Sequence, residues 1–155
     1  MIRSKKLSRF REIEHFFFNR LGGKSKGIYK SLNCGPGSSD NKKNILENLA
    51  IVEKKINSGS NKIVLLDQIH SDKFYYIDKK SKHNHKKFTG DALITNKSNT
   101  PIAVLTADCA PILIFDKKNN TVAAIHAGWK GAYKGIIKKV VKFMIKKGSS
   151  TKDIT

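Results

Sequence analysis

Cysteine and proline are scarce in this sequence, and long hydrophobic runs are missing. Two cysteines, Cys34 and Cys109, and three prolines occur among 155 residues. Two thiols do not make a disulfide framework, which indicates a reducing compartment and gives no support to a Cys34–Cys109 bridge. No apolar run approaches the roughly 18 residues of a membrane helix, and Phe16–Phe18 is too short for the core of a signal peptide. We therefore expect a cytoplasmic protein.

Acidic residues and arginine are also rare. The chain has 12 aspartates and glutamates against 31 lysines and arginines, a formal net charge of +19. Only Arg3, Arg9, Arg11 and Arg20 carry the guanidinium that nucleic-acid binders use for bidentate contacts. Aromatic residues, at 8%, are too few to interleave with the basic ones. The charge indicates a solvated lysine surface that favours anionic ligands such as phosphate or nucleotides. A nucleic-acid partner is not expected.

The remaining composition is that of a globular protein. With 155 residues and 39% hydrophobic content, the chain can bury a real core, and we expect a single domain over residues 1–155. Strands are predicted at residues 15–18, 63–66, 74–77, 90–95 and 102–105. A first helix is expected after an Asp40 N-cap, with apolar residues at helical spacing: Ile45, Leu49, Val52 and Ile56.

A second helix is expected after Trp129, ending at a Gly148 C-cap. Its lysines line one side, and its apolar face is Tyr133, Ile136, Ile137, Val140, Val141 and Met144. Runs of strands separated by single helices are typical of an α+β layered fold. We expect a largely antiparallel or mixed β-sheet flanked by helices.

The stretch from Leu105 to Trp129 carries the chemistry. Two apolar segments flank Lys117–Asn120, a polar tetrapeptide of hairpin-loop length. If the segments pair antiparallel, Cys109 and His126 lie at the same end of the hairpin. A cysteine beside a histidine supports either a thiolate activated by a base or a ligand pair for zinc.

A second histidine extends this pair to three candidate ligands. His70 follows a predicted strand, as Cys109 and His126 adjoin strand ends. Two imidazoles and a thiolate suit Zn²⁺, and an open fourth position would make the site catalytic. Nearby aspartates could orient an imidazole or move a proton: Asp67, Asp91 and Asp108. From spacing alone, a buried structural cysteine and two histidines bonded to backbone remain the alternative.

Two other segments carry weaker signals. The polar loop at residues 22–27 contains glycine, lysine and serine and could cradle a phosphate, although its spacing is that of an ordinary turn and not of a P-loop. His83 and His85 have a His-x-His spacing that could bind metal, but nothing acidic or apolar surrounds them.

Several motifs together resemble one known family. In chain order they are Gln68-Ile69-His70, Asp91-Ala92-Leu93-Ile94-Thr95, Thr106-Ala107-Asp108-Cys109-Ala110-Pro111 and His126-Ala127-Gly128-Trp129-Lys130-Gly131. The segments Phe18–Gly23 and Ser31–Asn33 resemble its N-terminal signature. The set is similar to the family once called multicopper polyphenol oxidases or laccase-domain proteins and now described as purine nucleoside phosphorylases, with YfiH-like bacterial members and a FAMIN-type animal member. The likeness runs from about His15 to Gly131.

The resemblance implies a site and a reaction. It implies zinc, with copper as a second candidate, on His70, Cys109 and His126, which would also be the catalytic residues. It implies phosphorolysis of adenosine, inosine and S-methyl-5′-thioadenosine, with some adenosine deamination, so that purine nucleosides and phosphate are the expected partners. Substrate binding falls on Arg20, Asn33 and Lys130.

The sequence departs from the family at three points. Lys130 stands where the family usually has arginine, which would weaken a bidentate contact to an oxyanion. Ser71 stands where the family usually has glycine. Family members also continue beyond the point where this chain stops, so we expect an incomplete YfiH-like domain whose activity depends on what the missing part supplies.

Three other functions stay open at this point. A metal-free cysteine hydrolase or deamidase would use Cys109 as nucleophile and His126 as its base. Copper-dependent phenol oxidation is an older reading of the same three ligands, which suit zinc at least as well. An inactive basic module that binds nucleic acid would show an affinity that falls steeply with salt.

Overall fold

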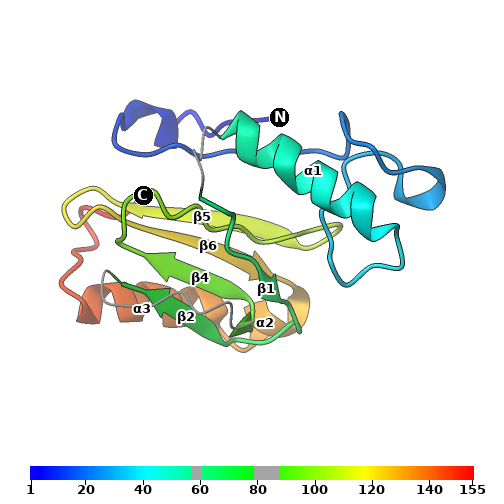
Figure 1. The fold of residues 1–155 in the computed structure, drawn as a ribbon. Coiled ribbons are helices and arrows are strands. Elements are labelled where there is room, and N and C mark those ends of the chain that lie inside the picture. The colour runs from blue at the N-terminus through cyan, green and yellow to red at the C-terminus, as the bar shows by residue number, and fades with distance from the viewer. Residues whose placement is uncertain (57–60, 79–87) are drawn as a thin grey trace. The chain divides into compact units, whose positions relative to one another are not determined.

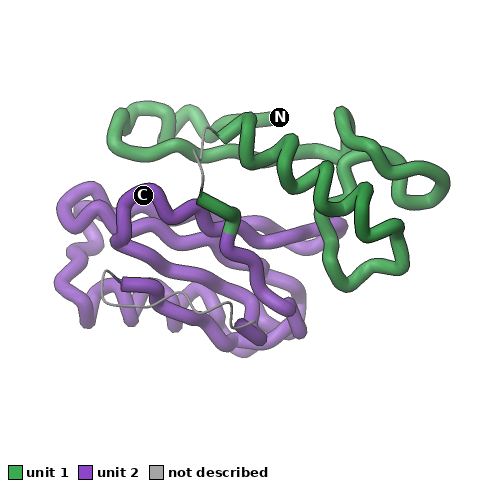
Figure 2. The backbone as a smooth tube through the Cα atoms, viewed as in Figure 1, with its two compact units in different colours: residues 1–63 green, residues 64–155 purple. Residues whose placement is uncertain are grey.

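The computed structural model describes residues 1–56, 61–78 and 88–155. His83 and His85, the predicted His-x-His pair, lie outside the described residues. The chain divides into two compact units, residues 1–63 and residues 64–155 (Figure 2). The predicted hairpin and all three candidate ligands belong to the second unit, which is therefore described first.

A four-stranded mixed sheet forms the centre of the second unit (Figure 1). Its strand order is β2-β4-β6-β5, with bounds Phe74–Ile77, Ala92–Thr95, Thr121–Ala127 and Ala110–Asp116. β2 and β4 are parallel, whereas β6 is antiparallel to both of its neighbours. Two further short strands, β1 (Leu66–Asp67) and β3 (Phe88–Thr89), pair in parallel as a separate sheet. The predicted α+β class is confirmed.

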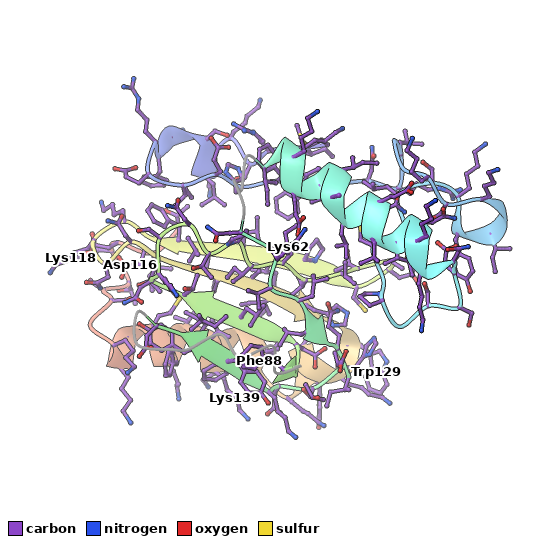
Figure 3. The ribbon with its side chains drawn as sticks, in the orientation of Figure 1. Lys62, Phe88, Asp116, Lys118, Trp129 and Lys139 are labelled. Atoms are coloured by element: carbon purple, nitrogen blue, oxygen red, sulfur yellow. The ribbon has the colours of Figure 1, made fainter. Side chains whose placement is uncertain are left out.

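The predicted hairpin is confirmed in its register. β5 and β6 pair from Asp116 opposite Thr121 to Ala110 opposite Ala127, so Pro111 faces His126. At the loop end, the buried carboxylate of Asp116 accepts backbone N–H bonds from Lys118 at 2.9 Å and Asn119 at 3.3 Å (Figure 3). These bonds fix the turn and hence the pairing. Cys109 and His126 therefore lie at the opposite end.

The predicted second helix is two helices, α2 (Trp129–Tyr133) and α3 (Ile136–Lys146). Gly135, with φ of 78°, breaks the helix in a left-handed conformation that glycine adopts without strain. Tyr133, predicted on the apolar face, is 90% exposed because it precedes this break. Gly148, with φ of 100°, ends α3 as predicted.

α3 packs on one face of the sheet. Ile136, Val140 and Met144 are buried against alternate residues of β4 and β6, with Ala92 and Ile94 among them. Leu93 points to the opposite face and packs with Leu66 and Ile77. Strand β4 is buried along its whole length because both faces of the sheet are covered there.

Three predicted strands are wrong or shorter than expected. Residues 15–18 form only one bridge, Phe17 to Ile2. Residues 63–66 and 102–105 share a single bridge, Val64 to Ile102. Further along, the side chain of Gln68 takes the place of a ladder partner: its Nε2–H donates to the carbonyl of Leu105, whose N–H donates to Oε1, both at 2.7 Å.

The first unit contains α1 (Lys42–Lys55) and two 3-10 turns, η1 (Leu7–Arg9) and η2 (Gly27–Tyr29). The N-cap is Asn41, whose side chain accepts the Lys43 N–H at 2.8 Å, and not Asp40 as predicted. The Asp40 carboxylate instead accepts from Asn33. The buried Asn48 side chain accepts the Lys24 N–H at 2.7 Å and donates to Asn33 O at 2.8 Å, which holds the loops before α1 in place.

Within the described residues, no helix is long and apolar enough to cross a membrane. This agrees with the missing apolar run in the sequence.

The packing of α3 predicts a contrast between two isoleucines of one helix. Ile136→Ala removes a side chain with 0% exposure and should lower the free energy of unfolding by about 2–5 kcal/mol. Ile145→Ala, at a position 41% exposed, is the matched control and should cost much less. Urea unfolding followed by circular dichroism measures both. Equal losses would contradict the packing described here.

His15 predicts a dependence of stability on pH. Burial lowers the pKa of His15 below its usual value of 6.5. Its Nε2 accepts the N–H of Ser4 at 2.9 Å, which requires the neutral ring. The unfolded chain therefore takes up the proton first, so this residue's contribution is full above about pH 6.5 and is lost as pH falls below it. Urea midpoints between pH 7.5 and 5.5 should fall less in His15→Gln than in the wild type; parallel slopes would refute this.

Candidate metal centre

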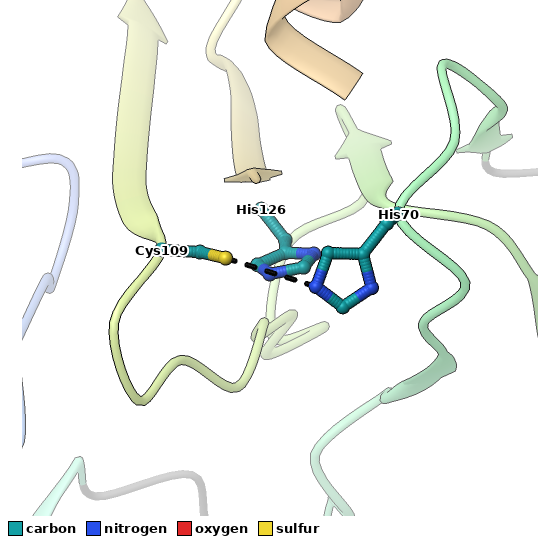
Figure 4. A group of neighbouring side chains, drawn as sticks. All are labelled: His70, Cys109 and His126. Atoms are coloured by element: carbon teal, nitrogen blue, oxygen red, sulfur yellow. Dashed lines mark hydrogen bonds between the residues drawn. The ribbon is translucent and has the colours of Figure 1, made fainter. Parts of the chain in front are cut away.

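His70 lies just beyond β1, in a backbone conformation that is uncommon for residues other than glycine. Its φ is 56°, in the left-handed region, and its side chain is exposed. Its backbone N–H donates to Asp91 Oδ1 at 3.0 Å. Strained backbone of this kind persists only where neighbouring groups hold it. Here the restraint comes from Asp91 and directs the imidazole toward the end of the hairpin (Figure 4).

The hairpin supplies the other two side chains. Cys109 immediately precedes β5, and His126 is the penultimate residue of β6. Cys109 Sγ lies 3.7 Å from His70 Nε2, and the rings of His70 and His126 meet edge to face with centroids 4.8 Å apart. One ligand atom from each of the three residues lies within 4.8 Å of the other two (Figure 4). The three predicted ligands therefore converge.

The carboxylate of Asp91 is hydrogen-bonded to both histidines of this group. Asp91 is fully buried. Its Oδ1 accepts from His126 Nδ1 at 2.8 Å and from the His70 N–H, while Oδ2 accepts the N–H and Oγ–H of Ser71 at 2.6 and 2.7 Å. Burial alone would raise the pKa of Asp91, but the bonds from His126, Ser71 and His70 together hold the pKa below its usual range.

This hydrogen bond assigns the tautomer of His126. An ionised Asp91 accepts only, so the proton of the bond belongs to Nδ1 of His126. The lone pair of the neutral ring is then on Nε2. Carboxylates hold metal-binding histidines in this way, and the bond also makes the ring a better ligand.

Close backbone approach at Gly128 completes the site. A Cβ at this position would lie 2.7 Å from His70 Cδ2 and 3.1 Å from Cys109 Sγ. Any other residue would push two of the three ligands aside. The two hydrogen bonds between the Gln68 side chain and the Leu105 backbone also connect the turn before His70 to the segment that leads to Cys109.

The donor set fits a metal ion. Tetrahedral Zn²⁺, with bonds of about 2.0 Å to nitrogen and about 2.3 Å to sulfur, separates those two atoms by about 3.6 Å. The observed 3.7 Å between Cys109 Sγ and His70 Nε2 matches this value. The His70, Cys109 and His126 group could therefore bind a metal, with a fourth position left for another ligand.

Of the three aspartates predicted near the site, Asp91 alone is buried. Asp67 and Asp108 are exposed. Ser71 and Gln68 are further site residues that the sequence did not assign, since their role depends on hydrogen bonds to positions 20 and 37 residues away. Cys34 and Cys109 are both free thiols.

The predicted substrate residues are distributed over both units. Arg20, in residues 1–63, is exposed, and its carbonyl accepts from the N–H groups of Ser31 and Leu32. The Asn33 amide donates to Ser38 Oγ at 2.8 Å and to Asp40 Oδ2 at 3.0 Å. Lys130, in α2, is exposed with its Nζ 5.4 Å from the centroid of the Trp129 ring. Their contact with substrate stays a prediction.

Fold and site define an α+β protein with a candidate metal centre of two histidines and one cysteine. Residues 14–155 match the family described as multi-copper polyphenol oxidoreductase laccase, and the chain belongs to this family. The resemblance seen in the sequence is thereby confirmed.

Individual relatives give the same result. A purine nucleoside phosphorylase of Bacteroides thetaiotaomicron is 33% identical over 161 residues, covering 99% of this chain and 60% of the relative. A purine nucleoside phosphorylase of Clostridium acetobutylicum is 44% identical over 91 residues, covering 58% of this chain and 37% of the relative. The crystal structure of the hypothetical protein YfiH of Bacillus licheniformis aligns with a TM-score of 0.80 at 28% identity, covering 87% of this chain and 53% of that one.

The chain is thus shorter than the proteins it matches. The matched residues cover 60%, 37% and 53% of the lengths of these three. The activity of the whole relatives is considered for this chain only as a proposal.

Asp91→Ala should weaken metal binding, measured with added Zn²⁺, about 10- to 100-fold, because both histidines lose the carboxylate that holds them. Competition with a chromophoric chelator measures the dissociation constant, and Asp91→Asn, which keeps the shape, should be weakened too. Asp108→Ala, at an exposed aspartate next to Cys109 in sequence, is the control and should bind as the wild type. Equal affinity in all four proteins would contradict the role given to Asp91.

Proposed function

We propose that this chain belongs to a zinc-dependent purine nucleoside phosphorylase acting on adenosine, inosine and S-methyl-5′-thioadenosine, with adenosine deamination as a side activity. The observation that carries the proposal is the convergence of His70, Cys109 and His126 beside Asp91. The purine nucleoside phosphorylases among the relatives support the reaction class.

Zinc is the metal that the donor set favours. A thiolate with two imidazoles suits this ion, and the 3.7 Å between Cys109 Sγ and His70 Nε2 is the separation of two ligands on one zinc. Copper takes similar ligands, and the donor set by itself does not exclude it. The bound ion would supply a Lewis acid for a substrate oxygen or a bound water.

The roles of this chain's residues follow from the reaction. In phosphorolysis a phosphate oxygen bonds to C1′ of the ribose while the bond from C1′ to the purine nitrogen breaks, and the purine leaves with that electron pair. His70, Cys109 and His126 are the proposed ligands and catalytic residues, and Asp91 holds the His126 ring and the His70 backbone. The net charge of +19 favours the approach of phosphate.

Arg20, Asn33 and Lys130 are the proposed substrate residues. Lys130 is the second residue of α2, whose N-cap is Gly128, the residue that lies close to His70 and Cys109. Its backbone is therefore two residues along the chain from the site. Asn33 already uses its amide hydrogens on Ser38 and Asp40. Its side-chain oxygen Oδ1 accepts the Gly35 N–H at 3.0 Å, so a contact from Asn33 to substrate would use the second lone pair of Oδ1 or replace one of these bonds.

Cys109→Ser tests the proposal directly. The wild type should contain about one zinc per chain, and the variant should lose it because the thiolate is the strongest ligand of the set. Cys34→Ser, at the other free thiol, is the matched control and should keep its zinc. Metal analysis is combined with turnover of adenosine, inosine and methylthioadenosine in phosphate buffer. Full phosphorolysis by Cys109→Ser would overturn the proposal.

A metal-free thiol enzyme is the second candidate. The observation in its favour is the 3.7 Å contact between Cys109 Sγ and His70 Nε2. The sequence pointed to His126 as the base, and its Nε2 keeps the lone pair while Nδ1 is bonded to Asp91. The ring nitrogen in contact with the thiol is that of His70, so the pair formed here is Cys109 with His70. Alkylation of Cys109 that substrate blocks, together with activity that survives a chelator, would favour this candidate.

A further inference from the structure

Ser71, the residue after His70, is buried, with 8% exposure, and its polar groups converge on one atom. Its backbone N–H donates to Asp91 Oδ2 at 2.6 Å, and its Oγ–H donates to the same oxygen at 2.7 Å. Two donors from one residue therefore occupy one of the two oxygens of Asp91.

This occupation decides what the other oxygen of Asp91 can do. With Oδ2 held by Ser71, Oδ1 faces the His70 N–H at 3.0 Å and His126 Nδ1 at 2.8 Å. A carboxylate turns about its Cβ–Cγ bond unless both oxygens are bonded, since that torsion is broad. The hydroxyl of Ser71 thus restrains the rotation that would move Oδ1 away from the histidines.

Ser71 is itself held from two other sides. Its Oγ accepts the Lys73 N–H at 3.2 Å, which fixes the hydroxyl hydrogen toward Asp91. Its carbonyl lies against Gly131 of α2, where a Cβ would come within 2.7 Å of the Ser71 oxygen. The next residue, Asp72, pairs with Lys139 of α3. These contacts hold Ser71 in place between α2 and the site.

We propose that Ser71 is a positioning residue of the metal centre, acting through Asp91 on both His70 and His126. The inference rests on the proposed function, because it assumes that these histidines bind zinc. It adds a hydroxyl that is bonded to Asp91 and Lys73, is not among the candidate ligands, and restrains the geometry of two of them.

The test compares the zinc affinity of Ser71→Ala with that of the wild type. Loss of the hydroxyl should raise the dissociation constant about 10-fold, the lower end of the range for groups that orient metal ligands. Competition with a chromophoric chelator gives the constant. The visible absorption of the Co²⁺-substituted proteins reports ligand geometry, and the band pattern of the variant should shift. Ser71→Thr keeps the hydroxyl and should restore both readouts.

Ser149→Ala is the matched control. Ser149 is also a buried serine, 7% exposed, bonded to a buried aspartate, Asp116, at the loop end of the hairpin. The Ser149→Ala substitution should lower the unfolding midpoint without changing zinc affinity or the Co²⁺ spectrum. If Ser71→Ala does not fold, Ser71→Gly replaces it, because glycine also removes the hydroxyl.

The outcomes separate the role of Ser71 from the proposed function. A wild type that binds zinc and a Ser71→Ala variant of equal affinity and spectrum overturn the role of Ser71 and leave the proposed function standing. A wild type that binds no zinc overturns both. Weakening in Ser71→Thr equal to that in Ser71→Ala would assign the effect to packing and not to the hydroxyl.

Discussion

The four hydrogen bonds of the Asp91 carboxylate are the constraint on which the site depends. A buried ionised group is tolerated only when its lone pairs are satisfied. Here the donors that satisfy them are the backbone of His70, the ring of His126 and both polar groups of Ser71. The same four hydrogen bonds therefore satisfy the charge and place two candidate metal ligands.

The hairpin places the third candidate ligand, Cys109, by a different means. The register of β5 and β6 fixes Cys109 and His126 at one end, and the turn at Asp116 fixes that register from the other end. Gly128 then allows the backbone to pass close to His70 and Cys109. Hydrogen bonding thus orients the two histidines, whereas strand pairing and steric room place the thiol.

Much of this could be predicted from the sequence because the signals are local. Strand period and a polar tetrapeptide locate the β5–β6 hairpin, and helical spacing locates α1 and α3. The three ligands followed from residues adjoining strand ends. Local signals failed where tertiary contacts override them: Tyr133 was expected in the core, Asp40 as the cap of α1, and residues 102–105 as a strand. A side chain, Gln68, replaces a strand partner there, and no periodicity reports that.

The sequence by itself determined which groups this protein can use: one thiol and two imidazoles, each next to a predicted strand end. Only the tertiary structure decided that Asp91, and not Asp67 or Asp108, holds the histidines, and that Ser71 holds Asp91. The physical reason is distance along the chain. Asp91 lies 35 residues from His126 and 21 from His70, and a hydrogen bond over such separations exists only after the sheet has formed.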